Sequence, residues 1–153
     1  MPDPFLTRDL RIVPNGIFID PPQPQDRAII THGHADHARY GHGAVLATPD
    51  TIAVMKARYG EDAAGRWDEL PYGQTRQIGG VTVSLHPAGH ILGSAQVLLE
   101  YKGQRIVVTG DYKRLEDRTA QPFELVKCDL LVTEATFGLP VFQHPRPAEE
   151  IAR

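Results

Sequence analysis

The stretch Thr31-His32-Gly33-His34-Ala35-Asp36-His37 decides the fold, because it holds three imidazoles and a carboxylate at fixed spacing. Side chains alternate along a strand, so His32 and His34, at a strand end, point to the same side and can share one metal ion. Asp36 and His37 lie on the turn that follows and are well placed for a second ion. Nitrogen and carboxylate ligands in such a set favour zinc, with manganese or iron possible.

Two positions further along the chain complete a candidate ligand set. His90 follows a strand that ends at a glycine, and Asp111 stands at the tip of a strand rich in β-branched residues. Alone, His90 is more simply a structural histidine, and Asp111 could equally be a turn aspartate. Together with the cluster they predict one ion held by histidines and a second ion beside it, with a shared carboxylate: His32, His34 and His90 for the first, Asp36 and His37 for the second, and Asp111 between them.

Bulk properties set limits on the class of protein. The chain has 153 residues, which is one domain or part of a larger one. It has no run of about 18 apolar residues and no apolar core of signal-peptide type near its start, so we expect no membrane association and a cytoplasmic location. Its single cysteine cannot form an internal disulfide. The net charge of −3 does not indicate nucleic-acid binding, so such a substrate must be argued from the site.

Local signals predict a chain of mostly strands with one helix between Thr48 and Gly60. Thr48 is a suitable N-cap, Pro49 suits the first helical position and Gly60 ends the helix. The apolar run at 129–133 is typical of a central strand covered on both faces. The last residues, 147–153, resemble the first turns of a helix. The remaining predicted strands are 10–13 and 16–20, joined as a hairpin, then 27–31, 44–47, 81–86, 95–101 and 105–109.

In motif order this chain resembles the metallo-β-lactamase superfamily, through Asp20 at a strand end, the histidine cluster, His90 and Asp111. The resemblance implies an α/β fold of αββα sandwich type. The stretch 132–138, with Glu134 followed by a small residue, threonine, an aromatic residue and glycine, resembles the first motif of the β-CASP nucleases. The segments 26–39, 87–96 and 110–114 are most similar to bacterial ligase-associated DNA exonucleases, a group also described as mRNA 3′-end processing exonucleases.

The resemblance has one departure, at the end of the chain. β-CASP enzymes resemble a metallo-β-lactamase domain with a second domain inserted after the first acidic motif, followed by further histidines. We therefore expect residues 1–138 to be the N-terminal part of the metallo-β-lactamase domain and 139–153 to be the start of the insertion. His144 reads as an ordinary loop histidine. On this interpretation the 153 residues supply most of the ligands, but alone they are an incomplete enzyme.

By resemblance, the site is that of a metal-dependent phosphodiesterase, a DNA or RNA exonuclease in which two divalent ions, zinc or manganese, activate a hydroxide. Asp36 would bind metal and accept a hydrogen bond from the nucleophile. Glu134 would pair with a proton-donating histidine, although by itself it reads as a solvated carboxylate. Asp20 would orient a ligand histidine through its ring N–H, or equally cap the next turn.

Two other functions stay open from the residues alone. One is a small-molecule ester or thioester hydrolase of the same fold, similar to glyoxalase II, against which the context of Glu134 argues. The other is a non-catalytic β-CASP-like scaffold, against which the complete set of expected ligands argues. The expected partners are a nucleic acid and an ATP-dependent DNA ligase acting in the same pathway.

Overall fold

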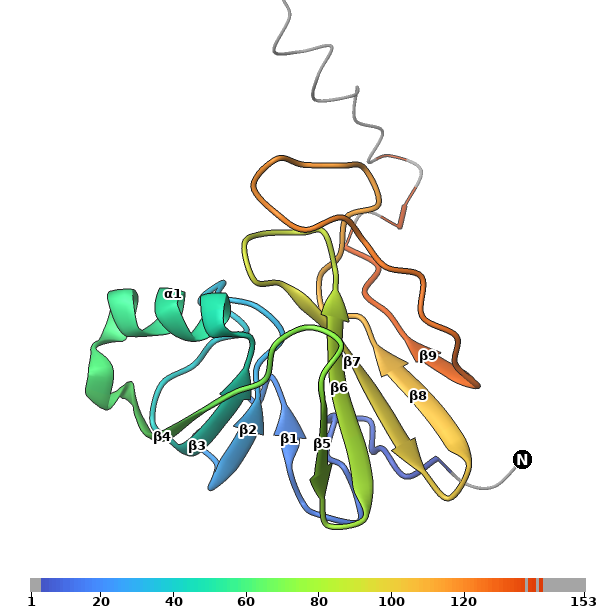
Figure 1. The fold of residues 1–153 in the computed structure, drawn as a ribbon, viewed down its shortest axis with the longest axis horizontal. Helices are drawn as coiled ribbons and strands as arrows, with labels where there is room; N and C mark the ends of the chain where they lie inside the picture. The colour runs from blue at the N-terminus through green and yellow to red at the C-terminus, as the bar shows by residue number, and fades with distance from the viewer. Residues whose placement is uncertain (1–3, 137, 140, 142–153) are drawn as a thin grey trace, which may run out of the picture.

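The computed structural model describes residues 4–136, 138, 139 and 141, which form two β-sheets and one α-helix (Figure 1). The first sheet has the order β1-β2-β3-β4 and the second the order β5-β6-β7-β8-β9. In chain order the elements are β1 (Phe18–Ile19), β2 (Arg27–Ile29), β3 (His42–Ala47), α1 (Pro49–Tyr59), the 3-10 turn η1 (Glu61–Ala63), β4 (Ala64–Glu69), β5 (Thr75–Ile78), β6 (Val81–Pro87), β7 (Ala95–Tyr101), β8 (Gln104–Val108) and β9 (Leu130–Val132).

The core lies between the two sheets. The first sheet contributes Ile19, Ile29 and Leu46, and the second contributes alternate residues of its long strands, such as Val83 and Val97, all buried. A smaller core joins α1 to the outer face of the first sheet. These layers, a helix and two packed sheets, belong to the predicted αββα sandwich. Within the part of the chain that is described, no helix covers the outer face of the second sheet.

Strand direction brings several strand ends to one edge of the sandwich. The first sheet is parallel throughout. In the second sheet β6 and β8 both run antiparallel to β7, and β9 is parallel to β8, so β6, β8 and β9 point the same way. The loops after β1, β2, β6, β8 and β9 carry the residues that the sequence singles out: Asp20, the histidine cluster, His90, Asp111 and Glu134.

The helix begins and ends at the residues that the sequence predicts. The side chain of Thr48 accepts a hydrogen bond from the backbone N–H of Thr51 at 3.2 Å, and Pro49 opens the first turn. Gly60 closes the helix with a φ of 97°, which a side chain rarely tolerates. Ile52 and Met55 are buried against the first sheet.

The interpretation of 129–133 as a central strand covered on both faces was wrong. Among the described residues β9 pairs only with β8 and forms an edge of the second sheet. Leu130 and Val132 pack against the core, whereas Leu131 points away and is 53% exposed. The physical reason is that a continuous apolar run does not reveal how many neighbours a strand has.

The predicted strands at the start of the chain are shorter than expected. The hairpin is reduced to a tight turn, with an isolated bridge between Arg11 and Phe18 and a hydrogen bond of 2.8 Å from the N–H of Ile12 to the carbonyl of Ile17. The predicted strand 27–31 ends at Ile29. The strands β4 and β5 were not expected. The predicted helix at 147–153, His144 and most of the 139–153 segment lie outside the described residues.

Candidate metal centre

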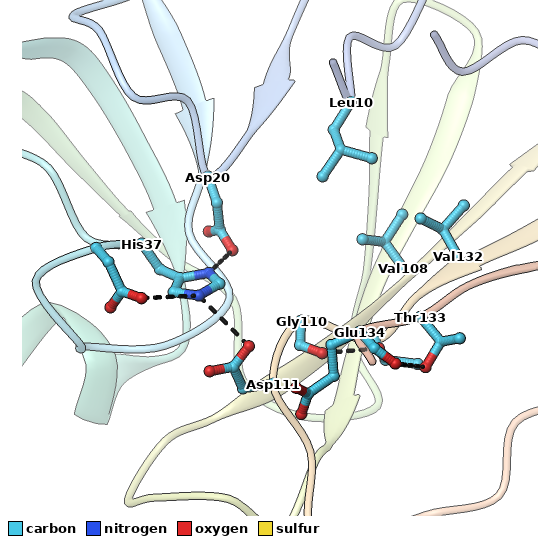
Figure 2. Close-up of a pocket in the computed structure, with 11 residues that line it drawn as sticks. Leu10, Asp20, His37, Val108, Gly110, Asp111, Val132, Thr133 and Glu134 are labelled. Atoms are coloured by element: carbon cyan, nitrogen blue, oxygen red, sulfur yellow. Dashed lines mark hydrogen bonds and ion pairs between the residues drawn. The ribbon is translucent and has the colours of Figure 1, made fainter. Parts of the chain in front are cut away.

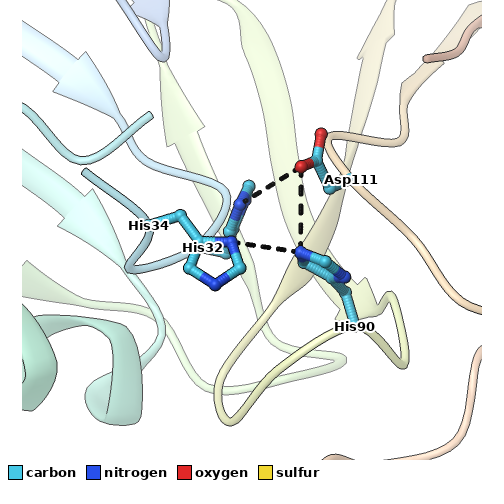
Figure 3. A group of neighbouring side chains, drawn as sticks. All are labelled: His32, His34, His90 and Asp111. Carbon is cyan, nitrogen blue, oxygen red and sulfur yellow. Dashed lines mark hydrogen bonds and ion pairs between the residues drawn. The ribbon is translucent and has the colours of Figure 1, made fainter. Parts of the chain in front are cut away.

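Four side chains converge at the strand ends to form the first group of candidate ligands (Figure 3). The Nε2 atoms of His32 and His90 each lie 3.7 Å from Oδ2 of Asp111. Nε2 of His90 lies 3.2 Å from Nδ1 of His34. Two nitrogens bound to one tetrahedral zinc at ~2.0–2.1 Å lie roughly 3.4 Å apart, so this spacing suits a shared ion.

A second group meets the other oxygen of Asp111. Nε2 of His37 lies 3.4 Å from Oδ1 of Asp111 and 3.6 Å from Oδ2 of Asp36 (Figure 2). The Asp36 side chain is 74% exposed, so it forms the solvent side of this group. Asp111 therefore presents one oxygen to each group, and all six residues predicted as ligands are brought together. A further triplet that could hold an ion is Asp20 with His32 and His37.

Asp20 is occupied by hydrogen bonds that hold the histidine loop. Its Oδ1 accepts the N–H of Thr31 at 2.8 Å, and its Oδ2 accepts the Thr31 hydroxyl at 2.6 Å. The same Oδ2 lies 2.8 Å from Nδ1 of His37. A carboxylate can only accept here, so Nδ1 of His37 carries the proton and its Nε2 presents a lone pair to Asp36 and Asp111.

Thr31 sets the tautomer of His32 by the same reasoning. Its hydroxyl donates its one hydrogen to Asp20, so it accepts from Nδ1 of His32 at 2.9 Å. The proton of His32 is then on Nδ1, and its Nε2 carries a lone pair. That Nε2 atom is buried, and among the described residues it has no hydrogen-bond partner. A buried acceptor without a partner is costly, so its place at the convergence of the ligands fits a metal ion.

The pKa shifts support neutral imidazoles in the first group. Burial, and then the neighbouring His37, His90 and His34, lowers the pKa of His32 to about 3. Burial also lowers the pKa of His90. Both rings are therefore neutral at neutral pH, as metal binding requires.

In the second group the pKa values of His37 and Asp111 shift upward. The hydrogen bond to Asp20 is the main cause that raises the pKa of His37 above its ordinary value, and burial raises the pKa of Asp111. A cation bound between these groups would compete with protons for the lone pair on Nε2 of His37. Binding in this half of the centre is therefore expected to release protons.

Glu134 lines a cavity beside the second ligand group, but it belongs to neither group (Figure 2). The cavity has a volume of about 280 Å³, and its lining includes Asp36, His37 and Asp111, with Leu10, Val108 and Val132 on the apolar side. Oε1 of Glu134 accepts the N–H of Tyr112 at 3.2 Å, and the Thr136 hydroxyl donates to Oε2. This carboxylate is thus held at the cavity wall.

Sequence reasoning missed the residues that hold the ligand loops. Thr31 stands directly before the histidine cluster, yet its role depends on Asp20, which is remote in sequence. Ser94 likewise holds the loop of His90, in a tight turn that contains Gly93. The Ser94 hydroxyl accepts the N–H of His90 at 3.0 Å and that of Ile91 at 3.2 Å, while the Ser94 N–H donates to the carbonyl of Ile91.

Comparison with known proteins gives the family. The model of the beta-lactamase superfamily domain matches residues 2–145. A protein of Opitutus terrae named "Probable DNA ligase" is 40% identical over 136 residues, covering 88% of this chain and 13% of that protein. The "Endoribonuclease ysh-1" of Neurospora crassa is 41% identical over 162 residues, covering 83% of this chain and 19% of the relative. The chain thus spans less than a fifth of the length of these relatives.

Among solved structures, a protein of unknown function from Enterococcus faecalis V583 matches with a TM-score of 0.50. The match has 19% sequence identity and covers 57% of this chain and 25% of that one, so it supports the fold alone. The residues matched by the family model include both groups of candidate ligands. This chain belongs to the beta-lactamase superfamily, whose domain it carries over residues 2–145.

Proposed function

We propose that this chain carries the two-cation centre of a phosphodiesterase that cuts nucleic acid, a nuclease of the β-CASP branch. The observation that supports this most strongly is the position of Asp111, whose two oxygens face two different groups of ligands. The names of the relatives from Opitutus and Neurospora support a nucleic-acid substrate, one through DNA and one through RNA. Residues 1–138 would be the metal-binding portion, and 139–153 the start of the inserted domain.

In this proposal the ligands divide as their positions suggest. His32, His34, His90 and Oδ2 of Asp111 would hold the first ion, and Asp36, His37 and Oδ1 of Asp111 the second. Zinc suits the donor set best, and manganese is the alternative. Two divalent ions in such a centre lower the pKa of a water ligand to ~7 and offset charge on a scissile phosphate.

The chain's own residues would then orient the ligand histidines and accept a hydrogen bond from the attacking water. Asp20 and Thr31 keep the lone pairs of His37 and His32 aimed inward through the hydrogen bonds at Nδ1. Asp36, at the solvent side, would accept a hydrogen bond from the attacking water. Glu134, fixed at the cavity wall by Tyr112, would orient a proton-donating histidine of the β-CASP type.

The substrate would be a DNA or RNA strand attacked from its end, and an ATP-dependent DNA ligase would act in the same pathway. No described helix of the structure is long and apolar enough to cross a membrane. We propose that the protein acts in the cytoplasm.

The metal content of the purified chain tests this function. We expect about two zinc ions per chain after dialysis against trace zinc, and loss of both in Asp111→Ala, because each group then lacks the oxygen that Asp111 supplies to it. End-labelled DNA and RNA test the substrate when they are incubated with a form that also carries the inserted domain and the later histidines, and with the Asp36→Asn variant of that form. Hydrolysis of S-lactoylglutathione without cleavage of either nucleic acid would instead favour the thioester hydrolase, and less than one ion per chain would favour the scaffold.

A further inference from the structure

The helix α1 touches both of the loops that carry the candidate ligands, and it does so along one stripe of its surface. Thr51, Val54 and Arg58 are spaced by three and four residues, so they lie on the same helix face. The adjacent stripe, which contains Ile52 and Met55, is the one buried against the first sheet. Packing against the first sheet therefore does not account for the stripe formed by Thr51, Val54 and Arg58.

At its N-terminal end the helix holds the loop of His90. The carbonyl of Gly93 accepts two hydroxyls from the helix, Thr48 at 2.7 Å and Thr51 at 3.1 Å, and both threonines are buried. Gly93 has a φ of +78°, and a Cβ there would lie only 2.7 Å from the backbone nitrogen of Thr51. The loop thus rests on the helix with no space for a side chain.

Toward its C-terminal end the same stripe holds the histidine cluster. The guanidinium of Arg58 donates through Nη1 to the carbonyl of Gly33, the residue between His32 and His34. A Cβ on Gly33 would lie 2.6 Å from Cγ1 of Val54. The strand-end turn that presents the two histidines is therefore fixed to the helix by one hydrogen bond and one close contact.

We infer that Thr51 and Arg58 are positioning residues for the metal centre. Through them α1 holds the loop of His90 and the histidine cluster at a fixed distance from each other, before an ion binds. The inference rests on the proposed metal site. The two loops that the helix holds bring Nε2 of His90 to 3.2 Å from Nδ1 of His34. Ligands ordered in advance cost less entropy when an ion binds, so the helix raises affinity without contacting the metal.

The dissociation constant for zinc tests this, measured by competition with a chromophoric chelator on variants shown to be folded by circular dichroism. Thr51→Val keeps the side-chain volume and removes the hydroxyl. Arg58→Met keeps the aliphatic stem and removes the donor. Each should weaken zinc binding by about tenfold, the scale seen when partners of metal ligands are removed.

Two further variants separate positioning from a general effect on the helix. Lys56→Met removes a cation of the same helix that pairs with Glu61 at 3.0 Å, away from both loops, and should keep the wild-type affinity. Arg58→Lys restores a donor and should recover most of the affinity. In addition, the visible spectrum of the cobalt-loaded chain should change in Thr51→Val and in Arg58→Met but not in Lys56→Met.

Wild-type zinc affinity in folded Thr51→Val and Arg58→Met would overturn the inference and leave the metal site standing. An equal loss of affinity in Lys56→Met would overturn it too, because the effect would then come from the helix as a whole. If the wild-type chain binds no zinc, the inference and the proposed function both fail. Should Thr51→Val not fold, Arg58→Met decides alone, since Arg58 lies at the surface.

Discussion

The carboxylate of Asp20 lies 2.8 Å from Nδ1 of His37, and its two oxygens also receive the N–H and the hydroxyl of Thr31. Through these contacts one side chain, which follows β1, fixes the rings on both sides of the candidate centre. Asp20 acts on His37 directly and on His32 through the Thr31 hydroxyl. The orientation of these candidate ligands is thus set by groups that need not touch a metal.

Replacing Asp20 with asparagine should weaken zinc binding by about 10- to 100-fold, because the anionic acceptor that orients His37 is lost. The variant should also lower the pKa of His37 in the zinc-free chain, since the hydrogen bond to Asp20 is the main cause that raises it. Chemical shifts of the His37 ring followed against pH measure this. An unchanged pKa would contradict the assignment; the exposed Asp26→Asn serves as the control.

The raised pKa of His37 fixes the sign of one contribution to stability. The stability that protonated His37 contributes is fully present below about pH 6.5 and is lost as the pH rises through the folded-state pKa of His37. In the presence of chelator, Asp20→Asn should therefore cost more stability at low pH than at high pH. Urea unfolding at about pH 6 and pH 8.5 measures the difference, and an equal loss at both would speak against this coupling.

A substitution at Gly93 should show how closely the His90 loop rests on α1. Gly73→Ala is the matched control, because Gly73 has a similar positive φ, +76° against +78°, but open space around it. Gly73→Ala should cost only the backbone strain, about 1–2 kcal/mol. Gly93→Ala should cost about 1–3 kcal/mol more, because its Cβ meets the helix backbone. Equal melting temperatures for the two variants would contradict the close contact.

The buried His42 should make the zinc-free chain less stable in acid. Burial lowers its pKa below 6.5, and its Nδ1 accepts the N–H of Gln25 at 3.0 Å. The unfolded chain therefore takes up a proton more readily, so stability is full above about pH 6.5 and falls as the pH drops toward the folded-state pKa. The lowered pKa of His32 acts in the same direction.

His42→Asn removes one titrating group while keeping an acceptor for Gln25. The free energy of unfolding, measured in urea with chelator present, should fall less between about pH 7.5 and pH 5.5 in this variant than in the wild type. It should not become flat, because His32 and His90 still titrate with lowered pKa values. A decline as steep as that of the wild type would show that His42 is not the buried neutral group described here.

Residue types at particular positions predicted the features that depend on neighbouring residues alone. The helix was found from its caps, Thr48 and Gly60, because hydrogen bonds and backbone angles at helix ends select particular residues. The convergence of His32 and His34 was predicted from the alternation of side chains along a strand, but β2 ends at Ile29, so both histidines lie in the loop that follows it. Their link to His90 and Asp111 came from motif order, and the fold came from the same resemblance.

What the sequence could not give depends on contacts between distant residues. The strand β4 contains glycine and charged residues, which are poor strand formers, and its pairing with β3 is what orders it. Leu131 is as apolar as its neighbours, so nothing local shows that it faces outward. The contact of Arg58 with Gly33 joins a helix to a loop 25 positions away, beyond the reach of any periodicity.

Anomalous diffraction from crystals grown with zinc, collected at the zinc edge, shows whether Asp111 joins two cation sites. We predict two peaks, one on each side of the Asp111 carboxylate. One should be coordinated by His32, His34 and His90, and the other by Asp36 and His37, with ligand distances of ~2.0–2.2 Å. A single peak coordinated by Asp20, His32 and His37, or no peak beside Asp111, would show that this carboxylate does not join two cations.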